Sequence, residues 1–186
     1  MRITGGSLRG RRIEAPLGPT IRPTADRARQ ALFNILAHAP FGAGLLPDAR
    51  IVDVFAGTGA LGLEALSHGA AHATFIDRDP QAIATIRGNA ARLGEAARCD
   101  IRRGDALKPG RAAAACRIAF LDPPYGEGLA PLALAALAEG DWLEPGALCI
   151  VELSAAEHLA PPAGFTLLDE RTYGRAHLLF LGYRPT

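Results

Sequence analysis

The 186-residue sequence predicts an α/β fold whose mostly parallel sheet ends in an antiparallel C-terminal hairpin. Short apolar runs alternate with longer stretches of helical periodicity, which is the pattern of successive βαβ units. The end of the chain breaks this pattern, because residues 165–171 and 177–183 are β-like runs separated by a short segment that contains Tyr173-Gly174-Arg175. Two such runs joined by a tight turn are typical of a β-hairpin.

Five apolar runs predict the parallel part of the sheet, at residues 51–55, 73–77, 100–103, 118–122 and 147–153. The intervening helices are expected at residues 59–68, 80–93 and 129–138. Each of the first four strands ends near an acidic residue or a glycine, at the edge where open α/β sheets bind their ligands. Parallel strands followed by an antiparallel hairpin fit, by analogy, the Rossmann-like class I methyltransferase fold.

One more helix is expected before the first strand, at residues 24–37. Pro23 precedes it, Thr24 is suited to the N-cap, and Asp26 lies favourably in the first turn. Apolar residues at helical spacing form one face of this helix, and Arg27, Gln30 and Asn34 form a polar face. Residues 38–50 are rich in glycine and proline and predict a connecting loop.

The length and composition predict one ordinary globular domain over residues 1–186, with 1–21 as an N-terminal arm and 22–37 as the preceding helix. The first residues contain no apolar signal region, and no apolar run approaches the roughly 20 residues that span a bilayer. We therefore expect a cytoplasmic protein without a membrane partner, and a monomer.

The cysteines and histidines predict no metal site and no disulfide framework. The three cysteines are an odd number, far apart, and form no C-x-x-C pair. The five histidines show no ligand spacing with cysteines or acids. We expect the cysteines to be ordinary small apolar residues on or beside strands.

Positive charge is concentrated at the N-terminus. Residues 1–30 carry seven arginines against Glu14 and Asp26, a balance of +5, so the remaining residues sum to −4 within a total of +1. A basic arm on a mildly acidic body is expected of a nucleic-acid-binding protein, and the alternative is a solvated tail. The arginines that we expect to bind RNA phosphates are Arg9, Arg11, Arg12 and Arg22.

A glycine-rich loop follows the first predicted strand. Gly57-Thr58-Gly59-Ala60-Leu61-Gly62 is a complete G-x-G-x-x-G, whose glycines permit a tight turn and a close approach of a ligand to the backbone. Asp77, at the end of the second strand, is placed to accept bonds from ribose hydroxyls. Because NAD and S-adenosylmethionine both contain that ribose, the loop and Asp77 leave both cofactors open.

Two further acids favour S-adenosylmethionine. Asp53, in the strand before the loop, could anchor the cationic amino group of the cofactor's methionine moiety, whereas it would repel a pyrophosphate. Asp105, in Gly104-Asp105-Ala106 after the third strand, is suited to an adenine amino group, and its alternative is an ordinary turn residue. The remaining residues expected at the cofactor are Phe55, Ala56, Arg78 and Ala106.

The fourth strand ends in Asp122-Pro123-Pro124-Tyr125. The prolines fix the backbone and leave rigid carbonyls, while Asp122 supplies an acceptor and Tyr125 a stacking surface. Methylation of an exocyclic amine needs these groups, because the lone pair of such an amine is delocalised into the base. Accepting both N–H bonds, from the Asp122 carboxylate and the Pro123 carbonyl, localises the lone pair, and Tyr125 can hold the base in line.

These motifs carry a resemblance to a known family. D-P-P-Y resembles the signature of amino-methyltransferases that act on adenine, guanine, cytosine or glutamine amide. R-I-T-G-G-S-L-R-G-R-R-I at 2–13, R-P-T-A-D-R at 22–27, V-D-V-F-A-G-T-G-A-L-G at 52–62, F-I-D-R-D-P at 75–80 and R-T-Y-G at 171–174 resemble the RsmD family. Its members are bacterial 16S rRNA (guanine(966)-N(2))-methyltransferases, and the match covers almost the whole chain.

The resemblance implies transfer of a methyl group from S-adenosylmethionine to the N2 amine of a guanine in 16S rRNA, within the assembling or assembled small ribosomal subunit. It adds Thr24 and Arg27, from R-P-T-x-x-R, to the cofactor and base site. Gln30 stands where a glutamate is more usual, which leaves its role open, as are those of Tyr173 and Arg175. The alternatives are an amino-methyltransferase of another base such as adenine N6 in RNA or DNA, an NAD-dependent oxidoreductase, and a non-catalytic RNA-binding protein.

Overall fold

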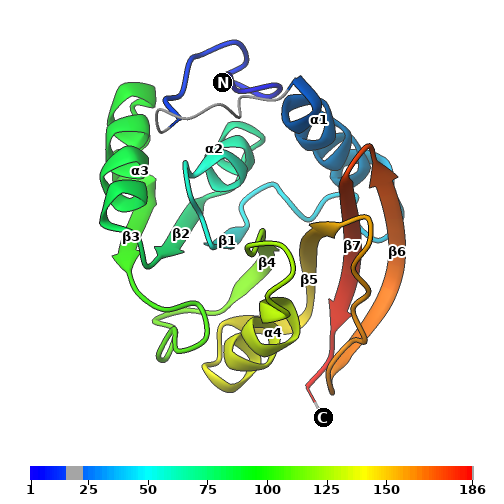
Figure 1. Cartoon of the computed structure of the whole chain (residues 1–186). Helices are drawn as coiled ribbons and strands as arrows, with labels where there is room; N and C mark the ends of the chain where they lie inside the picture. Colours follow the sequence, from blue (N-terminus) through cyan, green and yellow to red (C-terminus); the bar gives the residue numbers. More distant parts are fainter. Residues whose placement is uncertain (16–22, 186) are drawn as a thin grey trace.

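The computed structural model describes residues 1–15 and 23–185. Within this part of the chain, seven strands form one sheet in the order β3-β2-β1-β4-β5-β7-β6 (Figure 1). The strands are β1 (Arg50–Val54), β2 (His72–Asp77), β3 (Cys99–Arg103), β4 (Cys116–Leu121), β5 (Leu143–Ser154), β6 (Phe165–Tyr173) and β7 (Ala176–Tyr183). The helices are α1 (Pro23–His38), α2 (Ala60–Ser67), α3 (Pro80–Leu93) and α4 (Leu129–Glu139), with a short 3₁₀ turn at Ala96–Arg98.

The pairing of the strands confirms the predicted fold class. β1 to β5 pair in parallel, whereas β7 lies antiparallel between β5 and β6. β5 begins at Leu143, four residues before the predicted start, because Leu143 already pairs with Cys116 ahead of a register shift between Leu143 and Leu148. The sheet therefore places the carboxyl ends of five parallel strands at one edge, where ligands of open α/β sheets bind.

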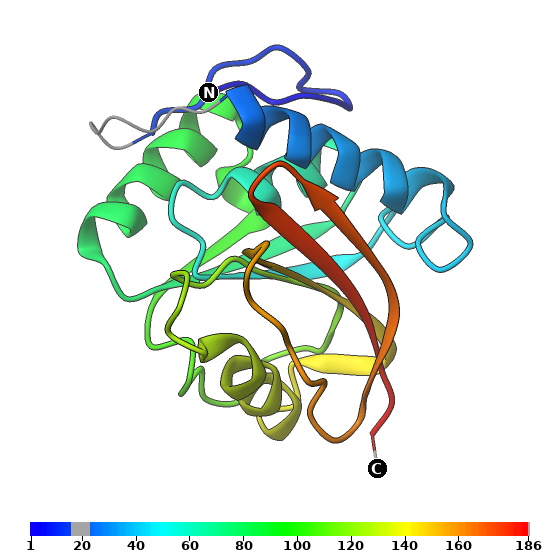
Figure 2. The same ribbon diagram turned by 45° about the vertical axis from the view of Figure 1, so that its right-hand side comes forward.

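Helices cover the two faces of the sheet unequally. Ile51, Phe120 and Ile150 point to the face that is covered by α1, α2 and α3, while Val52, Leu121 and Val151 point to the face that is covered by α4 (Figure 2). Alternate residues of a strand face opposite sides, so each strand supplies both cores. No helix in the described part of the chain is both long enough and apolar enough to span a membrane.

The N-terminal arm is folded against the rest of the domain and is not a solvated tail. Residues 1–14 turn back on themselves, with Arg2 and Arg12 paired in an antiparallel bridge and Ile3 and Ile13 buried. In Figure 1 this arm lies over α2, between α3 and the start of α1. Burial of Ile3 and Ile13, one on each side of the turn, holds the arm in this position, because it removes both apolar side chains from water.

Candidate active site

The glycine-rich loop joins β1 to α2 at the carboxyl edge of the sheet. Gly57 and Gly59 have positive φ angles of 54° and 75°, which glycine adopts without strain. Phe55 has a φ of 60° although it carries a side chain, a strained conformation that is typical of ligand-binding loops. A Cβ atom on Gly62 would collide with the Phe75 ring, so this glycine lets α2 pack closely on β2.

Asp53 lies beneath this loop and is buried. Its Oδ2 accepts a hydrogen bond from the Gly62 N–H at 2.9 Å. Burial raises the pKa of Asp53 to about 8; the Gly62 bond opposes this rise and the charge of Asp77 adds to it. A buried carboxyl group of this kind ionises more readily beside a cation, so the position favours a positively charged ligand group.

Asp77 holds the loop from the neighbouring strand. Its Oδ2 accepts the Gly57 N–H at 2.8 Å, and its Oδ1 accepts the Asp79 N–H at 2.9 Å. A carboxylate has about four acceptor positions, so these bonds leave capacity for ligand hydroxyls. Asp77 therefore shapes the glycine loop besides facing the cavity beside it.

Two cavities meet at this edge. We call the larger one, of about 460 Å³, the outer cavity. Its lining residues are Phe55, Gly57, Ile76, Asp77, Arg78, Ala106, Asp122, Pro123, Pro124, Tyr125 and Leu129. Asp105 is not among them: it is exposed, and its Oδ1 accepts the Leu107 N–H at 2.9 Å, which is the turn conformation weighed as its alternative.

The second, inner cavity measures about 290 Å³. Its lining residues are Met1, Ala28, Arg29, Leu32, Asp53, Phe55, Ala56, Gly57, Thr58, Ala60, Leu61, Asp122, Glu152 and Leu178. Phe55, Gly57 and Asp122 line both cavities. A group that passes from one cavity to the other would therefore pass beside the Asp122 carboxylate.

The Asp122–Tyr125 loop is held by two glutamates. Tyr125, 48% exposed, donates its hydroxyl hydrogen to Oε1 of Glu152 at 3.0 Å. Glu157 accepts the Gly126 N–H at 2.8 Å and the Ser154 N–H at 3.0 Å, which ties the loop to the end of β5. The tyrosine ring thus stands at the mouth of the outer cavity in a defined orientation.

Glu152 is a site residue that the sequence reasoning missed. It lies on β5 two residues after Ile150, so its side chain shares a sheet face with Asp122 and Asp53. The pKa of Asp122 lies well above the usual 3.8. The main cause is desolvation by the surrounding protein, and the charges of Glu152 and Asp53 add to it. Burial likewise raises the pKa of Glu152, against the Tyr125 hydrogen bond.

The signal for Glu152 was present in the sequence. The apolar run at 147–151 is followed directly by this acid, as the runs before Asp77 and Asp122 are. The rule that acids at the ends of parallel strands meet at one edge applies to the fifth strand as well. No group of three or more histidines, cysteines or acids among the described residues is arranged to hold a metal ion.

Helix α1 presents a different arginine from the one predicted. Arg27 is exposed and lines neither cavity, whereas Arg29 is buried and lines the inner cavity. Arg29 is paired with Glu64 and Asp26. Arg22 lies outside the described residues, as does the side chain of Thr24, so their predicted roles are not addressed by the structure.

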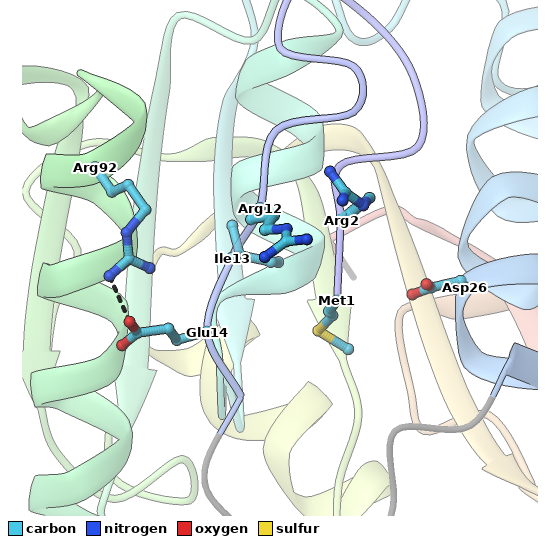
Figure 3. Close-up of a pocket in the computed structure, with 7 residues that line it drawn as sticks. All are labelled: Met1, Arg2, Arg12, Ile13, Glu14, Asp26 and Arg92. Atoms are coloured by element: carbon cyan, nitrogen blue, oxygen red, sulfur yellow. Dashed lines mark hydrogen bonds and ion pairs between the residues drawn. The ribbon is translucent and has the colours of Figure 1, made fainter.

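The arginines of the arm are not equivalent. Arg11 donates to the carbonyl oxygens of Leu93 and Arg92 at 2.9 and 2.5 Å, so it caps the end of α3. Arg9, Arg11 and Arg12 are all exposed, so Arg11 differs from the other two by its bonds to α3 and not by its exposure. Figure 3 shows Arg12 beside Arg2 in a surface hollow of about 650 Å³, with Arg92 bonded to Glu14 at its edge.

The chain is similar to known proteins over almost its whole length. The family model described as "Conserved hypothetical protein 95" matches residues 1–182. Ribosomal RNA small subunit methyltransferase D of Escherichia coli strain K12 is 38% identical over 178 residues, which cover 94% of this chain and 86% of that protein. The protein of the same name from Haemophilus influenzae is 34% identical and covers 94% of this chain and 89% of its own length.

Solved structures share the architecture. The yhhF protein from Escherichia coli superposes with a TM-score of 0.83 at 34% identity and covers 100% of this chain and 99% of its own. An RNA methyltransferase from Salinibacter ruber, solved in complex with S-adenosyl-L-homocysteine, superposes with a TM-score of 0.64 at 16% identity, over 91% of this chain and 95% of that one. At that identity the second likeness concerns the fold alone.

Proposed function

Because the chain belongs to the RsmD family, the one described as conserved hypothetical protein 95, we propose that it methylates the N2 amine of a guanine in 16S rRNA. The methyl donor is S-adenosylmethionine and the products are N2-methylguanine and S-adenosylhomocysteine. One observation carries the proposal: Asp122 lies where the outer and inner cavities join. An acceptor at that junction can hold an amine against a methyl group that is presented from the neighbouring cavity.

The residues fit S-adenosylmethionine. In the outer cavity, Asp77 would accept bonds from the ribose hydroxyls, and Ile76, Ala106 and Arg78, which line the same cavity, would hold the adenine ring. At the loop, Asp53 would pair with the α-ammonium group, and the bend at Phe55 and Gly57 would give the methionine part access to the backbone. When bound, this cofactor supplies an electrophilic methyl carbon on a sulfonium.

The chain's own residues prepare the amine. The Asp122 carboxylate and the Pro123 carbonyl accept the two N2–H bonds, while the Tyr125 ring stacks on the base. The amine nitrogen then forms a bond to the methyl carbon as the carbon–sulfur bond breaks, and the sulfur keeps that electron pair. The surplus proton of the amine passes to Asp122, whose raised pKa makes its carboxylate a better base.

The N-terminal arm and the R-P-T-x-x-R motif that follows it bind the RNA. Arg9 and Arg12, with Arg22 in the family motif, bind phosphates and orient the RNA without reading its sequence. A chain of this size has little surface for reading a long sequence, so a folded site in the small subunit presents the guanine. The enzyme acts as a monomer and without a metal ion.

The test is methylation with labelled S-adenosylmethionine. Small subunits that lack the modification, naked 16S rRNA and an unrelated RNA are incubated with the enzyme, and the RNA is digested to nucleosides. The proposal expects label in N2-methylguanosine, in 16S rRNA only. Label in N6-methyladenosine would show that the target is adenine and not guanine. Absence of transfer to every RNA would contradict the proposed activity.

A further inference from the structure

Three carboxylates converge on the inner cavity, and the reaction described above uses two of them. Asp53, Asp122 and Glu152 come from the ends of β1, β4 and β5, which are adjacent in the sheet. All three point to the face that α1 and α2 cover. Asp53 faces the methionine part of the cofactor and Asp122 the amine, which leaves Glu152 without a part in the chemistry.

Glu152 lies in an environment that favours hydrogen-bond donors as ligands. Among the described residues that line the inner cavity, Arg29 is the only arginine or lysine, and it is engaged by Glu64 and Asp26. The Tyr125 hydroxyl fixes the direction of the Glu152 carboxylate through Oε1, and a carboxylate has acceptor positions for more than one donor. Tyr125 thereby joins the stacking surface and Glu152 into one unit.

We propose that Glu152 makes the enzyme select guanine, by accepting the N1–H of the base while Asp122 and Pro123 hold the neighbouring N2 amine. This inference rests on the proposed function, because it concerns the base that enters the same site. Asp122 and Glu152 follow the paired residues Leu121 and Val151 on adjacent strands, so their carboxylates stand side by side, as N2–H and N1–H do on guanine.

The edges of the bases explain the selectivity. Guanine alone presents a ring N–H next to its exocyclic amine. Adenine has the acceptor N1 beside its N6 amine, and cytosine has the acceptor N3 beside its N4 amine. A carboxylate at that place attracts guanine and opposes both other bases, because two acceptors would face each other and neither would be satisfied.

The experiment replaces the target guanine with 2-aminopurine, which lacks the N1 hydrogen and the 6-oxo group, and the Glu152 variant separates the effect of N1 from that of the 6-oxo group. Synthetic RNA is ligated into 16S rRNA and assembled into small subunits that carry guanine or 2-aminopurine at the methylated position. 2-Aminopurine keeps the 2-amino group, but its N1 is an acceptor. Values of kcat/KM are measured for both substrates with the wild-type enzyme, with Glu152→Gln, and with the control Glu144→Gln. Glu144 is the second residue of the same strand, and its carboxylate forms a long ion pair, 3.7 Å, with Arg117.

We expect the wild-type enzyme to prefer guanine over 2-aminopurine on the order of 100-fold, because two acceptors that face each other in the site are both left unsatisfied. In Glu152→Gln this ratio falls at least about 10-fold, since the amide can donate to the acceptor N1. Glu144→Gln keeps the wild-type ratio. Calorimetry with S-adenosylmethionine should give Glu152→Gln a cofactor affinity close to that of the wild-type enzyme.

The outcomes separate the two proposals. If the wild-type enzyme methylates guanine but the ratio is unchanged in Glu152→Gln, Glu152 does not read the base. A large loss of cofactor affinity with an unchanged ratio would assign Glu152 to the cofactor instead. If the wild-type enzyme fails to methylate guanine in assembled subunits, the proposed function itself is wrong.

Discussion

The Nε of Arg29 on α1 lies 3.0 Å from Oε2 of Glu64 on α2, and both side chains are buried. The pair is also the anchor of the arm. Glu64 accepts hydrogen bonds from the Thr4 and Gly5 amides, and Arg29 donates to the Arg2 carbonyl. One buried ion pair thus joins α1, α2 and the N-terminal arm.

Glu64→Gln should lower the free energy of unfolding by about 3–5 kcal/mol, because it leaves Arg29 buried with its main partner neutralised. Burial opposes ionisation of Glu64, but the nearby His68 ring, the hydrogen bonds from Thr4 and the charge of Arg29 outweigh it and lower the pKa of Glu64 below 4.5. Its contribution is therefore present above pH 4.5 and is lost as the pH falls through the lowered value. Urea unfolding measures the loss. Glu14→Gln, which breaks the exposed pair with Arg92, is the control and should cost at most about 1 kcal/mol.

Asp77→Ala should weaken S-adenosylmethionine binding by about 1.5–3 kcal/mol, the range for hydrogen bonds to a charged group. Calorimetry measures the affinity, and Asp77→Asn should lose less because its amide oxygen can still accept the Gly57 N–H. NAD is titrated in parallel. Tight binding of NAD and none of S-adenosylmethionine would reverse the assignment of the cofactor.

Asp122→Ala should reduce kcat at least about 100-fold while changing cofactor affinity far less, since its bonds to the amine matter most as the transition state forms. Tyr125→Ala should weaken apparent RNA affinity as well, by about 1–3 kcal/mol of lost stacking. Tyr125→Phe keeps the ring and is the matched control for stacking. Full turnover in Asp122→Ala would exclude this loop from the chemistry.

Cofactor affinity should rise with pH. In the protein without ligand, the pKa of Asp53 is about 8, so the carboxyl group holds its proton at neutral pH. Binding of the cationic ammonium group favours the ionised form of Asp53, and this form becomes easier to reach as the pH rises. The Kd of S-adenosylmethionine should therefore fall by up to about tenfold per pH unit. Calorimetry between about pH 6 and pH 7.5, where an α-amino group is still largely charged, measures this trend. Asp53→Asn should bind more weakly and show a flat profile, and a pH-independent wild-type Kd would contradict the role of Asp53.

The same raised pKa affects folding in the opposite direction. A carboxyl group whose pKa is higher in the folded protein stabilises it fully below about pH 3.8, and this contribution is lost as the pH rises through about 8. Binding of the cofactor should restore the loss. Urea unfolding with and without S-adenosylmethionine separates the two effects.

Replacing Arg9 and Arg12 with alanine should make the slope of log RNA affinity against log salt shallower by roughly 1.5 units, because two phosphate contacts release fewer counterions. Arg11→Ala should instead lower the free energy of unfolding by about 1 kcal/mol, since it removes a cation from the C-terminal end of α3. A salt slope that is equal in wild-type and double-variant protein would leave Arg9 and Arg12 without a role in RNA binding.

Much of this architecture follows from periodicity and turn chemistry. The parallel strands and the hairpin were predictable because each depends on residues close in the sequence. The convergence of Asp53, Asp77 and Asp122 was predictable because parallel strands bring their carboxyl ends to one edge of the sheet. Arg29 and Glu64 were not, since a buried arginine is recognised only when its distant partner is known. Glu152 was not predicted as a site residue, and Asp105 was expected at the cofactor although it lies in a turn. Both have a related cause, because an acid beside a strand end looks the same in the sequence whether it faces a cavity or stabilises a turn.

The anchoring of the arm determines when this segment can find its place. Its hydrogen-bond partners on α2 and α3 lie 59 to 82 residues further along the chain. Contacts across such separations carry a loop-closure cost and form after the local βαβ units. On the ribosome the arm is synthesised before α2 and α3, so it must wait until α3 has emerged before it can dock.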